Sequence, residues 1–220
     1  MRKLNQKFPI IYIIIPLMLG FFIGYDIHED FVLLYFGKFA QNMERYTIII
    51  SILYIDYLVF KNINYTSIIF RYKMILDFFY KHFFKSSVYI IIFFVTLNIP
   101  ILFFNFEEYI YHLNSIIPNL ICSITISILF ISIVRIIDVF IKKRIISSII
   151  FVIVLVVLEV LFGNSHIFNF NYLFILGFVY KFYYFILMFM VGIIILNISI
   201  CSSLILRKDY MLNDKTNENN

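Results

Sequence analysis

The sequence predicts an all-α polytopic membrane protein with six transmembrane helices and both termini in the cytoplasm. Three observations lead to this fold class: an apolar composition, six apolar runs of helical length, and an uneven distribution of Lys and Arg between alternate connections. Of the 220 residues, 63% are hydrophobic and 14% are charged, and the mean hydropathy is +0.96. A soluble domain averages about 45–50% apolar and about 25% charged residues, so the composition places most of this chain in a lipid bilayer.

The first three spans are predicted at residues 8–25, 46–60 and 87–106. The first follows a short basic segment. Because no small-x-small cleavage site comes after it, we expect it to be retained as a span rather than removed as a signal peptide. Pro16 should kink this helix. The second span is shorter than the roughly 20 residues that a membrane helix needs, so it should extend into its flanks.

Spans four to six are predicted at residues 115–134, 145–163 and 182–206. The connection at residues 164–181 is mostly apolar but is interrupted by Asn, Ser and Gly. It is too polar at its start for a span and too apolar for a free loop, which predicts short helices that re-enter the outer leaflet under cover of protein. Residues 207–220 are polar and are predicted to be a disordered cytoplasmic tail.

The connection at residues 61–86 carries charge at regular intervals within an apolar pattern. Its charged side chains at Lys73, Asp77, Lys81 and Lys85 recur every four residues, which places them along one stripe of a helix. Apolar residues, mainly Phe and Ile, fill the positions between them. This division predicts an amphipathic helix that lies in the membrane interface with its ammonium groups toward the lipid phosphates.

The orientation follows from the basic residues. Of the 18 Lys and Arg residues, 15 fall in the termini and connections on one side, and only Lys38, Arg45 and Lys181 fall on the other. Because basic connections remain in the cytoplasm, both termini and residues 61–86 are predicted to be cytoplasmic.

Several functions are excluded by the sequence. Its one Gly-Lys pair, Gly37-Lys38, lacks the earlier Gly and the following Ser or Thr of a phosphate-binding loop, so we expect no ATP site in this chain. The basic residues are dispersed at span ends, which argues against a nucleic-acid partner. Cys122 and Cys201 fall near opposite membrane faces in this topology, farther apart than the roughly 7 Å that a disulfide allows, and are predicted to be buried and inert.

Two acidic residues, Asp56 and Glu159, lie inside predicted spans. An acid at the bilayer centre costs about 3 kcal/mol, so a functional role such as a proton relay is the default hypothesis. Each is only four residues from a span end, however, and Asp56 could reach the interface or pair with Lys61. We therefore favour structural pairing over catalysis for both.

Two acidic clusters that contain histidine are candidate metal sites. Glu107, Glu108 and His112 invite comparison with intramembrane proteases, but His112 occupies the position where those enzymes need Arg, and the other histidines lie in connections. A second cluster comprises Asp26, His28, Glu29 and Asp30. We favour solvated connection residues for both clusters and expect no metal or cofactor in this chain.

The order of elements resembles the membrane subunit of ABC-2-type exporters. Those subunits have six spans, a coupling helix between spans two and three, and short re-entrant helices between spans five and six. Residues 61–86 and 164–181 fall at these two positions. The small size and the run LVFKNINYTSIIFRYKMILDFFYKHFFKS are more narrowly similar to permeases that export bacteriocins, lantibiotics or phenol-soluble-modulin-like peptides from Gram-positive bacteria.

This resemblance implies a permease of the bacterial cell membrane that is not an enzyme by itself. Its partners would be cytoplasmic ATP-binding cassette subunits, which hold ATP and Mg²⁺, a second permease subunit, the lipid bilayer and an amphipathic peptide substrate, carried for secretion or self-immunity. The implied docking residues for the ATPase are Arg71, Lys73, Asp77, Lys81 and Lys85. The implied extracellular gate residues are Asn164, His166, Asn169, Asn171 and Lys181.

Three alternatives remain open. A substrate-binding subunit of an energy-coupled vitamin importer has a similar size, and Gly20 and Gly24 supply the small-residue spacing with which such a subunit packs its first span against a scaffold. A membrane immunity or accessory protein without transport activity is the second. An intramembrane enzyme is the least favoured, because of the histidine positions.

Overall fold

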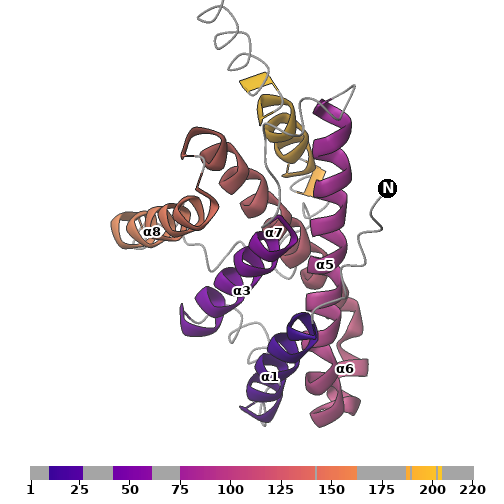
Figure 1. The fold of residues 1–220 in the computed structure, drawn as a ribbon. Coiled ribbons are helices and arrows are strands. Elements are labelled where there is room, and N and C mark those ends of the chain that lie inside the picture. Colours follow the sequence, from indigo (N-terminus) through magenta and orange to yellow (C-terminus); the bar gives the residue numbers. More distant parts are fainter. Residues whose placement is uncertain are drawn as a thin grey trace, which may run out of the picture.

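The computed structural model describes residues 10–26, 42–60, 75–141, 143–162, 187–188, 190–201 and 203–204, and this part of the chain is α-helical with no strand (Figure 1). The all-α prediction is therefore confirmed for these residues. The helices are α1 (Ile11–Asp26), α3 (Asn42–Phe60), α5 (Ile75–Phe104), α6 (Phe106–Tyr111), α7 (Leu113–Ile141), α8 (Arg144–Phe162) and a C-terminal helix that includes Met190–Cys201.

Each predicted span coincides with one apolar helix. Within the described residues, Phe83–Phe104 and Ile116–Ile141 are long and apolar enough to cross a membrane. The four shorter apolar helices are Ile13–Tyr25, Tyr46–Leu58, Ile145–Leu158 and Met190–Cys201. That all six cross a bilayer, with both termini in the cytoplasm, stays a prediction.

Two helix boundaries differ from those that the sequence predicted. The interfacial helix was expected to end at residue 86, but Ile75–Phe104 is one continuous helix of 30 residues, so the end of the connecting segment is in line with the third span. The fourth span was expected to end at residue 134, but α7 continues to Ile141. Neither helix contains Gly, and Pro100 and Pro118 are their only prolines, so nothing in either sequence breaks the helix at the expected boundary.

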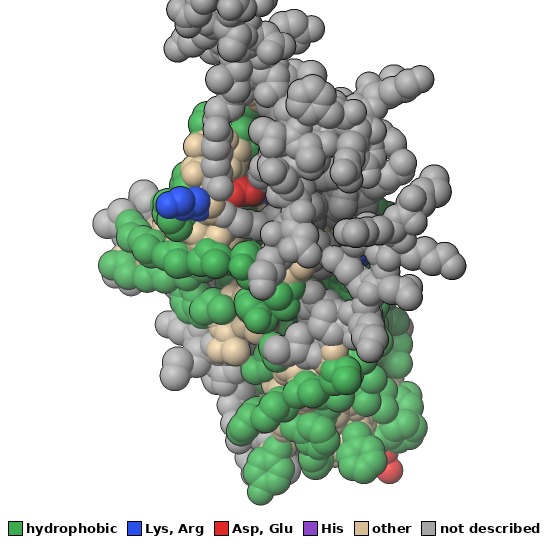
Figure 2. Space-filling view, in the orientation of Figure 1, with side chains coloured by type: hydrophobic (Ala, Val, Ile, Leu, Met, Phe, Trp, Pro, Cys, Tyr) green, Lys and Arg blue, Asp and Glu red, His purple; other side chains and the backbone are tan. Residues whose placement is uncertain are grey.

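The surface of α5 is apolar on both of its sides. Phe93, Phe94 and Leu97 are fully buried against the other helices. On the opposite side Val95, Ile99 and Phe103, four residues apart, are 51%, 54% and 76% exposed. Figure 2 shows hydrophobic side chains over most of the described part of one face of the molecule. A helix that is apolar all round is typical of a membrane span, whose outer stripe contacts lipid.

Helices α1, α3, α5 and α7 alternate in direction along the chain (Figure 1). Because Gly20 lies against Leu97 and Gly24 against Ile101, α1 and α5 run in the same direction. Helices α3 and α7 run opposite to α5. The C-terminal helix runs in the same direction as α7, and α8 leaves the end of α7 and projects from the bundle.

Helices α1 and α5 approach closely because of two glycines. A Cβ atom on Gly20 would lie 2.2 Å from the Leu97 carbonyl oxygen, and one on Gly24 would lie 3.0 Å from the Ile101 Cα. The Asn105 amide Nδ2 donates a hydrogen bond to the Gly24 carbonyl at 3.1 Å. The spacing of Gly20 and Gly24 thus serves packing within this chain.

Replacing Gly20 with Ala should therefore lower stability. The added Cβ meets a backbone atom that has no room to move, and such overpacking costs about 1–3 kcal/mol. Thermal unfolding in detergent can be followed with a thiol-reactive dye, because Cys122 and Cys201 are both free and buried. Gly192→Ala is the matched control, since its Cβ would have no atom within 4 Å. Equal melting midpoints for the two variants would contradict the close contact.

Candidate functional site

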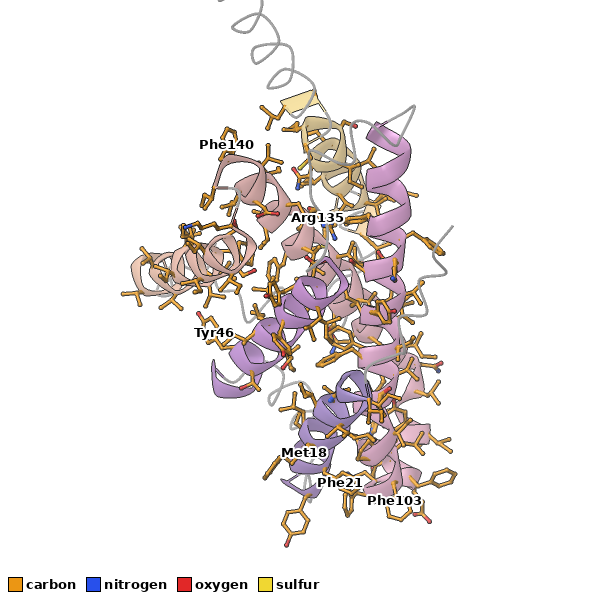
Figure 3. All side chains as sticks on the ribbon, viewed as in Figure 1. Met18, Phe21, Tyr46, Phe103, Arg135 and Phe140 are labelled. Carbon is orange, nitrogen blue, oxygen red and sulfur yellow. The ribbon has the colours of Figure 1, made fainter. Side chains whose placement is uncertain are left out.

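The candidate site is a buried charge network formed by Asp56, Ser86 and Arg135. The Arg135 guanidinium Nη2 lies 2.7 Å from Asp56 Oδ1 and donates a hydrogen bond to it. The Ser86 hydroxyl donates to the same Oδ1 at 2.8 Å and accepts from Arg135 Nη2 at 3.1 Å. The three residues are 2%, 2% and 3% exposed. Figure 3 shows Arg135 inside the bundle, whereas Phe103 and Phe140 lie on its outside.

Each network residue comes from a different helix. Asp56 lies one turn before the end of α3, Ser86 lies in the first half of α5, and Arg135 lies in the last third of α7. One turn before Ser86, the Phe83 ring lies with its centroid 5.8 Å from Arg135 Cζ, which adds a cation–π contact. The network therefore joins three helices that are far apart in the sequence.

Polar contacts extend the network to the C-terminal helix. Asn197 Nδ2 donates to the Ser132 hydroxyl at 2.9 Å, one turn from Arg135. Asp138, one turn farther along α7, is 2% exposed. The thiol of Cys201, on the C-terminal helix, interacts electrostatically with both Arg135 and Asp138. One cation and two carboxylates are thus gathered where the α3, α5, α7 and C-terminal helices meet.

A contact of this kind is strong only while both partners are present. A buried charge without a partner is costly, and removing one member of a buried pair typically destabilises a protein by about 3–5 kcal/mol. The pair holds the helices together while it is formed. A motion that separated its members would leave two buried charges without partners, so the helices would have to rearrange to relieve that cost.

Within the described residues, no group of three or more His, Cys, Asp and Glu side chains is arranged to hold a metal ion.

The sequence predicted that Asp56 is paired, and the structure places it in a pair, but the partner is Arg135. Lys61, the expected partner, lies outside the described residues. Arg135 was assigned to a cytoplasmic connection, and this was wrong: it is a buried residue of α7. The apolar pattern that continues after Arg135, through Ile136, Ile137 and on to Ile141, was the signal that the helix does not end there. No signal in the sequence pointed to Ser86.

The predicted docking residues are described only in part. Lys85 is half-buried in α5, with its Nζ 6.0 Å from the centroid of the Tyr89 ring. Asp77 and Lys81 lie in the first turns of α5, and the structure does not describe their side chains. Arg71 and Lys73 lie outside the described residues.

The remaining site predictions are also described only in part. Glu159 is a residue of α8 whose side chain is not described. All five predicted gate residues lie outside the described part of the chain: Asn164, His166, Asn169, Asn171 and Lys181.

The acidic cluster of Glu107, Glu108 and His112 lies on and beside α6. Glu107 and Glu108 are exposed in its first turn, and His112 Nε2 lies 3.6 Å from Glu108 Oε2. Burial raises the pKa of the Tyr109 phenol, and its hydroxyl donates to Asn98 Oδ1 on α5 at 3.2 Å. These contacts fasten α6 to the end of α5.

Comparisons with protein-family models, curated proteins and solved structures found no match.

The energetics of the network can be tested with a double-mutant cycle. Asp56→Leu and Arg135→Met should each destabilise the protein by about 3–5 kcal/mol, because each leaves one buried charge without its main partner. The double replacement Asp56→Leu with Arg135→Met removes both charges and should cost less than either single change. Thermal unfolding measures all three.

Glu107→Ala removes an exposed carboxylate and is the control; it should change stability by no more than about 0.5 kcal/mol. If the double replacement costs as much as the two single changes together, the pair makes no coupled contribution.

Proposed function

We propose that this chain is the permease subunit of an ABC-2-type exporter in a bacterial cell membrane. It would move amphipathic or antimicrobial peptides, with ATP hydrolysed by a separate cytoplasmic subunit. The observation that supports this most directly is the position of the buried network. Asp56 precedes the segment at residues 61–86 that matches the coupling position, and Ser86 is the last residue of that segment.

The directions of the helices support the six-span topology. In a chain with alternating spans, spans one and three run in the same direction, as α1 and α5 do. Spans four and six also share a direction, as α7 and the C-terminal helix do. The six-span topology requires a return across the bilayer between these two. The apolar helix in that place is α8, which lies across the direction of α7 in Figure 1 rather than opposite to it.

The network suggests how a motion at the coupling segment reaches the bundle. Residues 75–86 of the segment form the start of α5. A displacement of the segment would therefore move α5 as one helix, together with Ser86. The other end of the segment follows α3, which carries Asp56. Arg135 belongs to α7, which the segment does not join. Docking of the ATPase would therefore shift α3 and α5 relative to α7, and so strain the contacts of Arg135 with Asp56 and Ser86.

The remaining partners follow from this assignment. ATP and Mg²⁺ would be bound by the ATPase subunit and supply the energy for the motion. A second permease subunit, a copy of this chain or a related one, would complete the translocation path. The exposed apolar surface suits a peptide that is itself partly apolar.

The vitamin-importer alternative gains no support. It required Gly20 and Gly24 to face a separate scaffold, but α5 covers both glycines. A non-transporting immunity protein is distinguished by peptide resistance that survives deletion of the ATPase.

The topology can be tested by cysteine labelling of intact cells. Tyr111 is 81% exposed on α6, and Lys143 is exposed between α7 and α8. A membrane-impermeant maleimide should label Tyr111→Cys from outside and Lys143→Cys only after the cells are permeabilised. The parent chain is the control, because its two cysteines are buried. Labelling of both positions from the same side would contradict the six-span arrangement.

The docking role can be tested by charge reversal. The paired change Arg71→Glu with Lys73→Glu should abolish co-purification of the ATPase subunit and lower peptide export at least tenfold, because the partner would meet the opposite charge. Lys208→Glu with Lys215→Glu, in the predicted cytoplasmic tail, is the matched control and should leave both unchanged. Unchanged ATPase binding in the first variant would count against docking at this segment.

A further inference from the structure

An apolar pocket with a volume of about 430 Å³ lies between α3 and α8. Its walls include Leu53, Tyr54 and Tyr57 of α3 and one stripe of α8, formed by Ile145, Ile149 and Ile153. The Tyr54 and Tyr57 rings stack with their centroids 6.3 Å apart. The three isoleucines remain 52–55% exposed, so the pocket is open along the side of α8.

The lining of this pocket identifies the chemistry of its occupant. Its surface is entirely apolar. A peptide backbone in the pocket would lose hydrogen bonds to water and find no partner, at a large cost. A hydrocarbon chain has no such groups, and a volume of this size is within the range of about 300–1,000 Å³ that is typical of ligand pockets.

A basic residue adjoins one end of the same pocket along the chain. Lys143 is exposed and directly precedes α8, two residues before Ile145. Its carbonyl accepts hydrogen bonds from the Ser147 amide at 3.0 Å and the Ser147 hydroxyl at 3.1 Å, which hold its backbone at the start of the helix. Within the described residues, no carboxylate forms an ion pair with the Lys143 ammonium. Lys142 and Arg144 flank it in the sequence.

We propose that the α3–α8 pocket binds one acyl chain of an anionic phospholipid, and that the Lys143 ammonium contacts the phosphate of its headgroup. The apolar pocket and the charge at its end match the two parts of such a lipid, and the opening along α8 lets it enter from the bilayer. Basic residues beside pockets between membrane helices bind anionic headgroups in this way. The inference requires a bilayer around these helices but does not depend on the exporter assignment.

A lipid chain in the pocket would also affect the contact between Asp56 and Arg135. Tyr57 follows Asp56 on α3, so a lipid chain held against Tyr57 fixes the helix that supplies the carboxylate. The lipid would thereby favour the arrangement in which Asp56 contacts Arg135.

The chain contains no Trp, so one introduced Trp reports on a single place. Ile149→Trp places it in the pocket wall, and Ile99→Trp places it on the exposed stripe of α5 as the matched control. The full-length protein is reconstituted in phosphatidylcholine vesicles that contain increasing amounts of brominated phosphatidylglycerol or brominated phosphatidylcholine. Bromine quenches Trp fluorescence on contact.

We expect the pocket Trp to prefer phosphatidylglycerol by about fivefold, which corresponds to the roughly 1 kcal/mol that one lysine contributes near an anionic headgroup. The control Trp should show no preference. Lys143→Gln should remove the preference, and Lys143→Arg should retain it. If Ile149→Trp does not fold, Tyr54→Trp keeps an aromatic ring in the wall and gives the same measurement.

Equal quenching by the two lipids at the pocket position would overturn the proposal. So would a preference that survives Lys143→Gln. Quenching at residue 99 without any at the pocket position would also overturn it, because the pocket would then be closed to lipid.

Discussion

The buried contact between the Arg135 guanidinium and the Asp56 carboxylate constrains the arrangement of the whole bundle. Neither charge can be buried alone at acceptable cost, so α3 and α7 must meet where these two side chains lie, 2.7 Å apart. Ser86 donates to the same carboxylate oxygen and brings α5 to this point. The ring of Phe83 then covers one side of the guanidinium.

The opposite end of α5 is held by a different kind of contact. There the backbone of α1 approaches α5 at Gly20 and Gly24, and no charge is involved. The Asn105 amide joins Gly24, and the Tyr109 hydroxyl joins Asn98, so α1 and α6 are both fastened to the end of α5. Because α5 is a single helix of 30 residues, it connects the close-packed end with the charged end.

Helix α8 is attached to the bundle mainly through α7. It projects from the end of α7 (Figure 1), contacts the core through side chains such as Phe151 and Leu155, and borders an apolar pocket against α3. In the function that we propose, a tightly joined unit of α1, α3, α5 and α7 would transmit the motion, while α8 contributes a lipid-accessible surface. The polarity of the two regions agrees with this division, since the charged network is inside the unit and the pocket is entirely apolar.

The sequence alone determined the all-α class of the described residues and the approximate position of each apolar helix, because composition and hydropathy are properties of single segments. It favoured a structural pair for Asp56 without identifying Arg135 as the partner. It also showed the spacing of Gly20 and Gly24, without their partner. Only the tertiary structure decided that this partner is α5 and that Arg135 belongs inside the bundle. A charged residue that follows an apolar run is predicted from hydropathy to lie in water. Arg135 is buried instead, because the Asp56 carboxylate, 79 residues away in the sequence, neutralises its charge. A pairing between residues so far apart depends on how three helices pack.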